Sequence, residues 1–228
     1  MIDPENDGNA DQSDIDNAAE NEDHGNNSTD SDGDGLTGVE DCDDENPWVN
    51  EDCGRTCTGD FEILSDDDLP QVAGCAIING DLDIEGLSQT DLLALNHLEN
   101  VTGSLLIMNN ETLESTTGLD NLTNVGEDLL ISFNDALVNV NGLDSIQSVG
   151  NTLSLSNSSS LSNIQGLSGL ASVGSSILLN SIPIADLKGF ENLQIIGSSL
   201  YISDCPSITS LIDIADNLTS FGENDTVG

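Results

Sequence analysis

The chain has 228 residues, of which 36% are hydrophobic and only 3% are aromatic. Compact globular domains fill their centre with more rings, so this composition favours a thin repeat architecture packed with Leu, Ile and Val. The formal net charge of −41 arises from 43 acidic residues set against Arg55 and Lys188. Such a surface repels nucleic acid and anionic lipid, so we expect neither as a partner.

The cysteines indicate the compartment. They are Cys42, Cys53, Cys57, Cys75 and Cys205, and no CxxC pair supports zinc. Two disulfides and one remaining thiol predict an oxidising, extracellular or cell-surface location. The start, MIDPENDGNA, has neither the basic nor the apolar region of a secretory signal, and no stretch is long and apolar enough to cross a membrane. We therefore expect an exported form to be cut from a longer precursor.

Residues 1–29 consist mostly of Asn, Asp, Glu and Ser. A segment with so few apolar side chains cannot bury enough surface to offset the entropy lost on ordering. We predict a disordered acidic linker here.

Residues 30–53 form a dense carboxylate loop that we predict to bind calcium. The stretch DSDGDGLTGVED at 30–41 fits the pattern D-x-D-x-D-G with a carboxylate at position 12. Calcium takes about six to eight oxygen ligands, and alternating aspartates on a turning backbone direct their carboxylates to one point. Glu40 competes with Asp41 for the closing position. The predicted ligands are Asp30, Asp32, Asp34, the Leu36 carbonyl and Asp41.

The continuation EDCDDENP at 40–47 extends this loop. The whole stretch resembles the calcium-binding repeats of thrombospondin type 3, and a second ion would share Asp41, Asp43 and Asp44. Cys42 and Cys53 bracket the stretch, and pairing them would close a short loop. Crossed pairing with Cys57 and Cys75 stays open, because sequence alone does not fix connectivity.

Residues 54–75 are interpreted as the N-terminal cap of a repeat region that occupies residues 76–228. A motif L-x-I recurs there every 23–24 residues, and its period of two places both apolar side chains on one face of a strand. Two further apolar columns and two glycine columns keep the same period. The first residues of the motif are Leu82, Leu105, Leu129, Leu153, Ile177 and Leu200, and the second are Ile84, Ile107, Ile131, Leu155, Leu179 and Ile202.

This period, with several short strands and no helix-length stretch in each unit, predicts a solenoid. We expect an all-β, short right-handed parallel β-helix of six coils. At about 4.8 Å per coil its length is about 29 Å. A leucine-rich repeat has a similar period and is the alternative, but the two glycine corners favour the β-helix. Asn109, Asn157, Asn180 and Asp204 share one corner, where we predict a hydrogen-bonded ladder that Phe133 interrupts.

The repeat resembles the receptor L-domain family over residues 55–222. The residues that carry the resemblance are the unit LTNVGEDLLISFN at 122–134 and the opening GCAIINGDLDI at 74–84. The resemblance implies a β-helix with a disulfide between Cys57 and Cys75. It implies a binding module and identifies no ligand.

No catalytic constellation is found in the sequence. His24 and His97 have no second ligand or base at a suitable spacing, and Cys205 has no evident base. A polysaccharide lyase would need basic residues, and Lys188 is the only cation in the repeats. We therefore predict a non-enzymatic binding or adhesion module with a calcium-stabilised N-terminal segment and an extracellular protein or glycan ligand. The alternatives are a structural surface-layer or stalk spacer and, with less support, a lyase.

Overall fold

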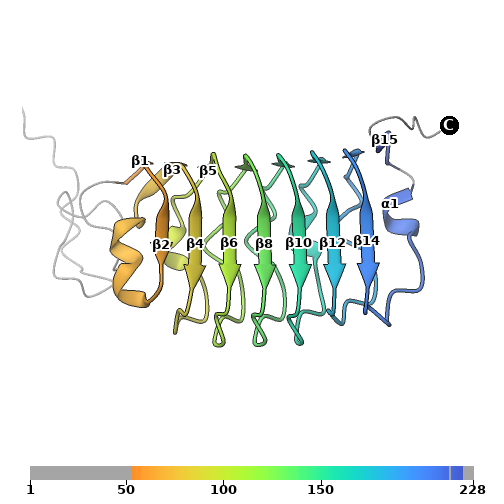
Figure 1. Cartoon of the computed structure of the whole chain (residues 1–228), viewed down its shortest axis with the longest axis horizontal. Helices are drawn as coiled ribbons and strands as arrows, with labels where there is room; N and C mark the ends of the chain where they lie inside the picture. The colour runs from red at the N-terminus through yellow and green to blue at the C-terminus, as the bar shows by residue number, and fades with distance from the viewer. Residues whose placement is uncertain (1–52, 216, 223–228) are drawn as a thin grey trace, which may run out of the picture.

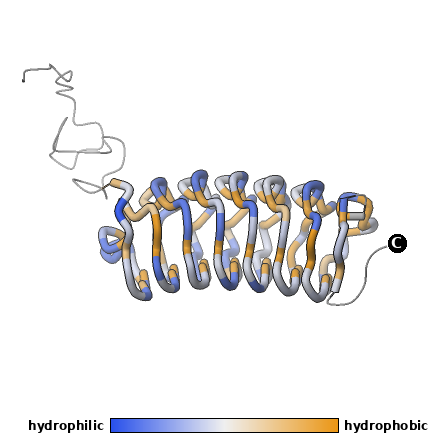
Figure 2. The backbone as a smooth tube through the Cα atoms, turned by 90° about the horizontal axis from the view of Figure 1, so that it is seen from above, coloured by the Kyte–Doolittle hydropathy of each residue, from blue (hydrophilic) through white to orange (hydrophobic). Residues whose placement is uncertain are grey.

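In a computed structural model, the chain is an all-β parallel solenoid of about seven coils, described over residues 53–215 and 217–222. Figure 1 shows the coils stacked along one axis, and Figure 2 shows them from above as a row of regularly spaced loops. Each coil contributes one strand to sheet A and one to sheet B, and between residues 100 and 203 the first has two residues and the second has four. The predicted disordered linker at 1–29 and the predicted calcium loop up to residue 52 lie outside the described residues.

Sheet A has eight strands and sheet B has seven, and neighbouring strands within each sheet are parallel. The strands of sheet A are β1 (Arg55–Thr58), β3 (Cys75–Asn79), β5 (Asn100–Val101), β7 (Asn124–Val125), β9 (Ser148–Val149), β11 (Ser172–Val173), β13 (Ile195–Ile196) and β15 (Ser220–Phe221). The strands of sheet B are β2 (Phe61–Ile63), β4 (Leu82–Glu85), β6 (Leu105–Met108), β8 (Leu129–Ser132), β10 (Leu153–Ser156), β12 (Ile177–Asn180) and β14 (Leu200–Ser203).

Short helical turns complete the coils, and none has the length of a helical half-repeat. They are the 3-10 helices η3 (Asp66–Gln71), η4 (Leu93–Leu95) and η5 (Gln165–Leu167) and the helix α1 (Ile212–Ala215). A leucine-rich repeat places a strand in a single sheet on one side of each unit. The second parallel sheet therefore favours the β-helix over that alternative.

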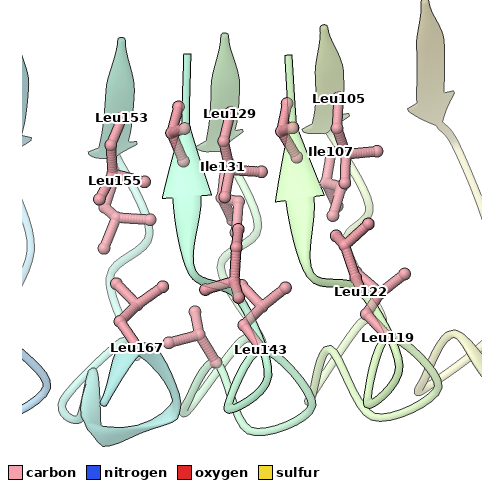
Figure 3. Close-up of a cluster of buried hydrophobic side chains, with 14 of the residues drawn as sticks. Leu105, Ile107, Leu119, Leu122, Leu129, Ile131, Leu143, Leu153, Leu155 and Leu167 are labelled. Atoms are coloured by element: carbon pink, nitrogen blue, oxygen red, sulfur yellow. The ribbon is translucent and has the colours of Figure 1, made fainter. Parts of the chain in front are cut away.

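The core is made of aliphatic side chains stacked in register. Leu105 pairs with Leu129 and Leu129 with Leu153 across sheet B, and the columns line up as the spacing of the L-x-I motif predicts. Figure 3 shows Leu105, Leu129 and Leu153 in one row, with Leu119, Leu143 and Leu167 on the opposite side of the core. All six side chains are fully buried. Continuous apolar columns of this kind supply the main free energy of folding in a solenoid.

Both predicted glycine columns are close backbone contacts between coils. A Cβ on Gly150 would lie 1.9 Å from the carbonyl oxygen of Gly126, and a Cβ on Gly174 would lie 2.0 Å from that of Gly150. In the other column Gly118 and Gly142 have φ of 108° and 100°, values that residues with a Cβ rarely adopt. Glycine is therefore required at both corners for clearance, and at Gly118 and Gly142 for backbone conformation as well.

The predicted asparagine ladder is displaced by one residue. Asn109 and Asn157 instead occupy a corner with positive φ, and Asn180 lies outside that column, where Ser181 takes the place. The ladder is formed by Asn110, Asn134 and Ser158, which are fully buried. Asn110 N–H donates to Asn134 Oδ1 (2.9 Å) and Asn134 N–H donates to Ser158 Oγ (3.2 Å), while the amide groups of both asparagines donate to backbone carbonyls. These bonds satisfy backbone groups that the turn would otherwise bury unpaired.

The segment 54–75, predicted as a cap, also provides strands. β1 and β2 are the first strands of the two sheets, which gives one coil more than the six expected. A disulfide joins Cys57 to Cys75, as the family resemblance implies. Arg55 donates to the carbonyls of Gln71 and Ala73, and η3 lies at the end of the rod beyond β2 (Figure 1). The N-terminal end of the solenoid is thus covered.

The buried ladder gives a test of the fold. Asn134→Ala removes the acceptor of the buried Asn110 N–H, so we expect a loss of about 1–3 kcal/mol in the free energy of unfolding. The exposed Asn141→Ala serves as the control and is expected to change stability by less than about 0.5 kcal/mol. Urea denaturation followed by circular dichroism measures both, and equal effects in the two variants would contradict the ladder.

Candidate functional site

The outward face of sheet B is the broadest regular surface on the solenoid. Every second residue of its strands points away from the core, and parallel pairing aligns these residues in two columns at about 4.8 Å per coil. The first column is Glu62, Asp83, Leu106, Leu130, Ser154, Leu178 and Tyr201, and the second is Glu85, Met108, Ser132, Ser156, Asn180 and Ser203. The chemistry of both columns changes along the axis from acidic, through apolar, to neutral and polar.

The acidic end consists of Glu62, Asp83 and Glu85 on β2 and β4. Burial raises the pKa of Asp83, and the neighbouring Glu85 and Glu62 raise it further. Its Oδ1 atom is buried and accepts no hydrogen bond. A partly buried carboxylate between two like charges is electrostatically unfavourable, so a cationic group placed near it would reduce the repulsion.

The apolar patch, defined as Leu106, Met108, Leu130 and Phe133, follows the acidic end. Leu106, Met108 and Leu130 are half-buried on β6 and β8, although their positions face away from the core. In most β-strands with one solvent-facing side these positions are polar. An apolar cluster at outward positions therefore indicates a surface that another molecule covers.

Phe133 is the most unusual residue of the patch. It directly follows β8 with φ of 57°, in a column where other coils place Gly86, Asn109 and Asn157. A left-handed backbone is strained for a bulky side chain. The ring nevertheless remains 55% exposed. Strain that does not serve packing points to a functional role.

The neutral end, defined as Ser154, Ser156, Leu178, Asn180, Tyr201 and Ser203, lies on β10, β12 and β14. The Asn180 amide donates to Ser203 Oγ at 2.6 Å, and the Tyr201 side chain is 60% exposed. Residues 145–185 contain no charged residue. This part of the face therefore offers hydroxyl, amide and aromatic groups, and the first two of its three coils contain no carboxylate.

A shallow hollow of about 340 Å³ near the N-terminal end is a weaker candidate, lined by Ser65, Asp66, Asp67, Gly86 and Ser88. Burial raises the pKa of Asp66, but hydrogen bonds from the Ser88 hydroxyl and N–H and from Gln89 outweigh it and leave the pKa below its usual value. The Asp66 carboxylate connects η3 to the next coil. It already accepts hydrogen bonds from Ser88 and Gln89, so we assign it a structural role.

Several predicted site residues fall outside this face. The predicted calcium ligands Asp30, Asp32, Asp34, Leu36, Asp41, Asp43 and Asp44 lie outside the described residues, as does Cys42. Cys53 is disulfide-bonded, and its sulfur lies 3.0 Å from Nε2 of His97. Among the described residues, no group of three or more His, Cys, Asp or Glu side chains could hold a metal ion.

The two remaining candidates for chemistry have structural surroundings. Lys188 forms an ion pair with Asp186 (3.2 Å), and the hydrogen bond and charge of Asp186 raise its pKa. A general base would need the opposite shift. Cys205 is buried and donates to the Ser203 carbonyl, in keeping with a packing role.

Residues 74–141, from the turn before β3 to the loop after β8, match the family described as Receptor L domain. Over these residues the β-helix is similar to a receptor L domain. No curated protein and no solved structure matches significantly. The family match suggests a ligand-binding module. Asp83, Glu85 and the apolar patch lie within the matched residues, whereas Glu62 and Cys57 precede them, and a disulfide joins Cys57 to Cys75 inside the match. No helix in the described part of the chain has the length and apolar character of a membrane span.

The face itself was not predicted from the sequence, although a signal for it exists. In the motif L-x-I the middle residue points outward, and it is Leu in three of the coils: Leu106, Leu130 and Leu178. Apolar residues at outward positions distinguish a binding surface from a solvated one. The strained backbone at Phe133 could not be predicted in this way, because the residue type alone does not reveal a positive φ angle.

The raised pKa of Asp83 predicts a pH-dependent effect on stability. The folded state disfavours the ionised form, so the carboxylate opposes folding at neutral pH, and this cost disappears as pH falls through its folded-state pKa. Asp83→Asn should therefore raise the melting temperature at pH 7, with a gain that shrinks as pH falls through the raised folded-state pKa and is absent below about pH 4. Glu111→Gln, at an exposed position, controls for general relief of negative charge. A gain that is the same for both variants, or independent of pH, would refute the assignment.

Proposed function

We propose that the protein is a non-catalytic extracellular binding module that captures a cationic, partly apolar polypeptide segment on the outward face of sheet B. The family match supports a ligand-binding role at the coarse level. We infer which surface binds, and the chemistry of its ligand, from the outward residues of β2, β4, β6 and β8.

The observation that carries this proposal is the strained, exposed ring of Phe133, which directly follows the strand that holds the outward Leu130. Its neighbours in the column include asparagine and glycine, which fit the left-handed backbone at lower cost. Phenylalanine at this place contributes exposed aromatic surface instead. Aromatic anchors at the centre of an apolar cluster contribute most of the affinity in many protein interfaces.

The ligand chemistry follows from the charges beside the patch. Asp83 Oδ1 accepts no hydrogen bond, and the pKa of Asp83 is raised by burial and by two carboxylate neighbours. A Lys or Arg side chain placed at this end would reduce the like-charge repulsion among Asp83, Glu85 and Glu62. The overall charge of −41 would also speed the approach of a cationic partner.

The two other functions considered have less support. A structural spacer would need no apolar cluster at outward positions, and Leu106, Met108 and Leu130 form one. A lyase acting on an acidic sugar would need a free basic group, whereas Lys188 is paired with Asp186. Binding therefore accounts for more of the observed surface than either alternative.

Selection of phage-displayed peptides on the whole chain tests the binding function. We expect enriched peptides to combine apolar residues with Lys or Arg, and Phe133→Asn should weaken them about 5- to 30-fold, the equivalent of roughly 1–2 kcal/mol. Val138→Asn, another exposed apolar position in the same coil, is the matched control and should have little effect. Enrichment of acidic peptides, or equal binding by both variants, would contradict the proposal.

The same Phe133→Asn variant makes a second, independent prediction. It reproduces the residue found at the same corner in the coils on either side, so relief of backbone strain should stabilise the fold by about 1 kcal/mol. Thermal melting measures this directly. A variant that loses binding because it is poorly folded would instead melt at a lower temperature than the wild type.

We further propose that Asp30, Asp32, Asp34, the Leu36 carbonyl and Asp41 bind one calcium ion, with Asp43 and Asp44 joining Asp41 at a second. The support is the D-x-D-x-D-G spacing of hard oxygen ligands. Isothermal titration with Ca²⁺ should show binding that Asp32→Asn and Asp34→Asn abolish and Asp16→Asn preserves. Equal titration of all three variants would indicate only diffuse attraction of the ion to an acidic chain.

A further inference from the structure

We infer that the neutral end of the outward face of sheet B is a second subsite, which binds a neutral glycan. The proposed polypeptide site lies on β2 to β8, whereas this subsite lies on β10, β12 and β14. The two sites therefore share a sheet but not their side chains.

The first argument is electrostatic. The described coils before Asp144 and after Ala185 carry carboxylates, but residues 145–185 carry no charge at all. A partner that covers a carboxylate removes it from water, which costs free energy unless the partner provides a positive charge. A neutral partner avoids this cost where carboxylates are absent, and the coils of β10 and β12 meet this condition. The coil of β14, which adds Tyr201 and Ser203 to the subsite, does carry carboxylates.

The second argument is the side-chain chemistry. Sugar rings present C–H groups on one face and hydroxyls around the rim, and they suit an exposed aromatic ring flanked by groups that both donate and accept hydrogen bonds. Tyr201 is 60% exposed at the end of the first column. Ser156, Asn180 and Ser203 form the adjoining column, and the Asn180–Ser203 hydrogen bond of 2.6 Å holds two of these polar groups in fixed positions.

The third argument is the repeat distance. Polar groups in one column recur once per coil, at about 4.8 Å, along a straight axis. This spacing is comparable with the length of one sugar unit, so an extended polysaccharide running along the axis would meet an equivalent group with each successive ring. A pocket is not required for such an extended ligand, and Figure 1 shows β10, β12 and β14 as a regular row of strands along the axis.

Affinity electrophoresis of the whole chain tests the inference with named polysaccharides in the gel: laminarin, dextran, galactomannan and xylan as neutral probes, and polygalacturonate as an acidic one. We expect at least one neutral probe, and not polygalacturonate, to retard the wild-type chain. Tyr201→Ala should weaken that retardation roughly tenfold, as loss of an aromatic anchor does in other interfaces. Tyr201→Phe, which keeps the ring, should retain it.

Phe133→Asn separates the two sites, because it should leave polysaccharide retardation unchanged while weakening the selected peptides. The inference is overturned if no neutral probe retards the wild type, or if Tyr201→Ala is retarded as strongly as the wild type. It is equally overturned if Tyr201→Ala weakens the peptides instead, which would assign this end of the sheet to the polypeptide ligand.

Discussion

Register between coils is the constraint on which the rest of the structure depends. Each coil is too thin to bury its own apolar face, so it is stable only when its leucines and isoleucines stack on the equivalent residues of its neighbours. A slip of one residue along a strand would turn Leu129 and Ile131 outward. The glycine corners enforce the same register sterically, because Gly150 and Gly174 lie against the carbonyl of the preceding coil.

The binding face follows from this constraint. Once inward positions are fixed by stacking, outward positions are free to vary without cost to the core, and parallel pairing aligns them into columns. One end carries carboxylates, the middle carries leucines, and the far end carries hydroxyls and a tyrosine. The solenoid can therefore present a series of different surfaces on one rigid scaffold, which suits a module that positions a ligand rather than transforming it.

Sequence reasoning was reliable where the period was strict and failed where it was not. The aliphatic and glycine columns recur every 23–24 residues, and all of them are found in the structure. The first coil was missed because Phe61 pairs with Leu82 at a spacing of only 21 residues, with η3 between the strands. The ladder was assigned to Asn109 rather than Asn110 because both are asparagine, and only backbone conformation separates the exposed, left-handed residue from the buried one. The outward face was not predicted for a related reason. The periodic signal lies in the inward columns, and Leu106 and Leu130 stand at the positions between them.

Amide hydrogen exchange measured by NMR tests the stacking most directly. The N–H groups of Leu105, Leu129 and Leu153 each donate to a carbonyl of the following coil, at 2.8, 2.8 and 3.0 Å. If the coils are in register, these three amides should be strongly protected and should exchange together, at the rate of global unfolding. Fast, independent exchange of Leu129 and Leu153 in the folded protein would contradict the stacking and, with it, the aligned surface on which the proposed binding sites depend.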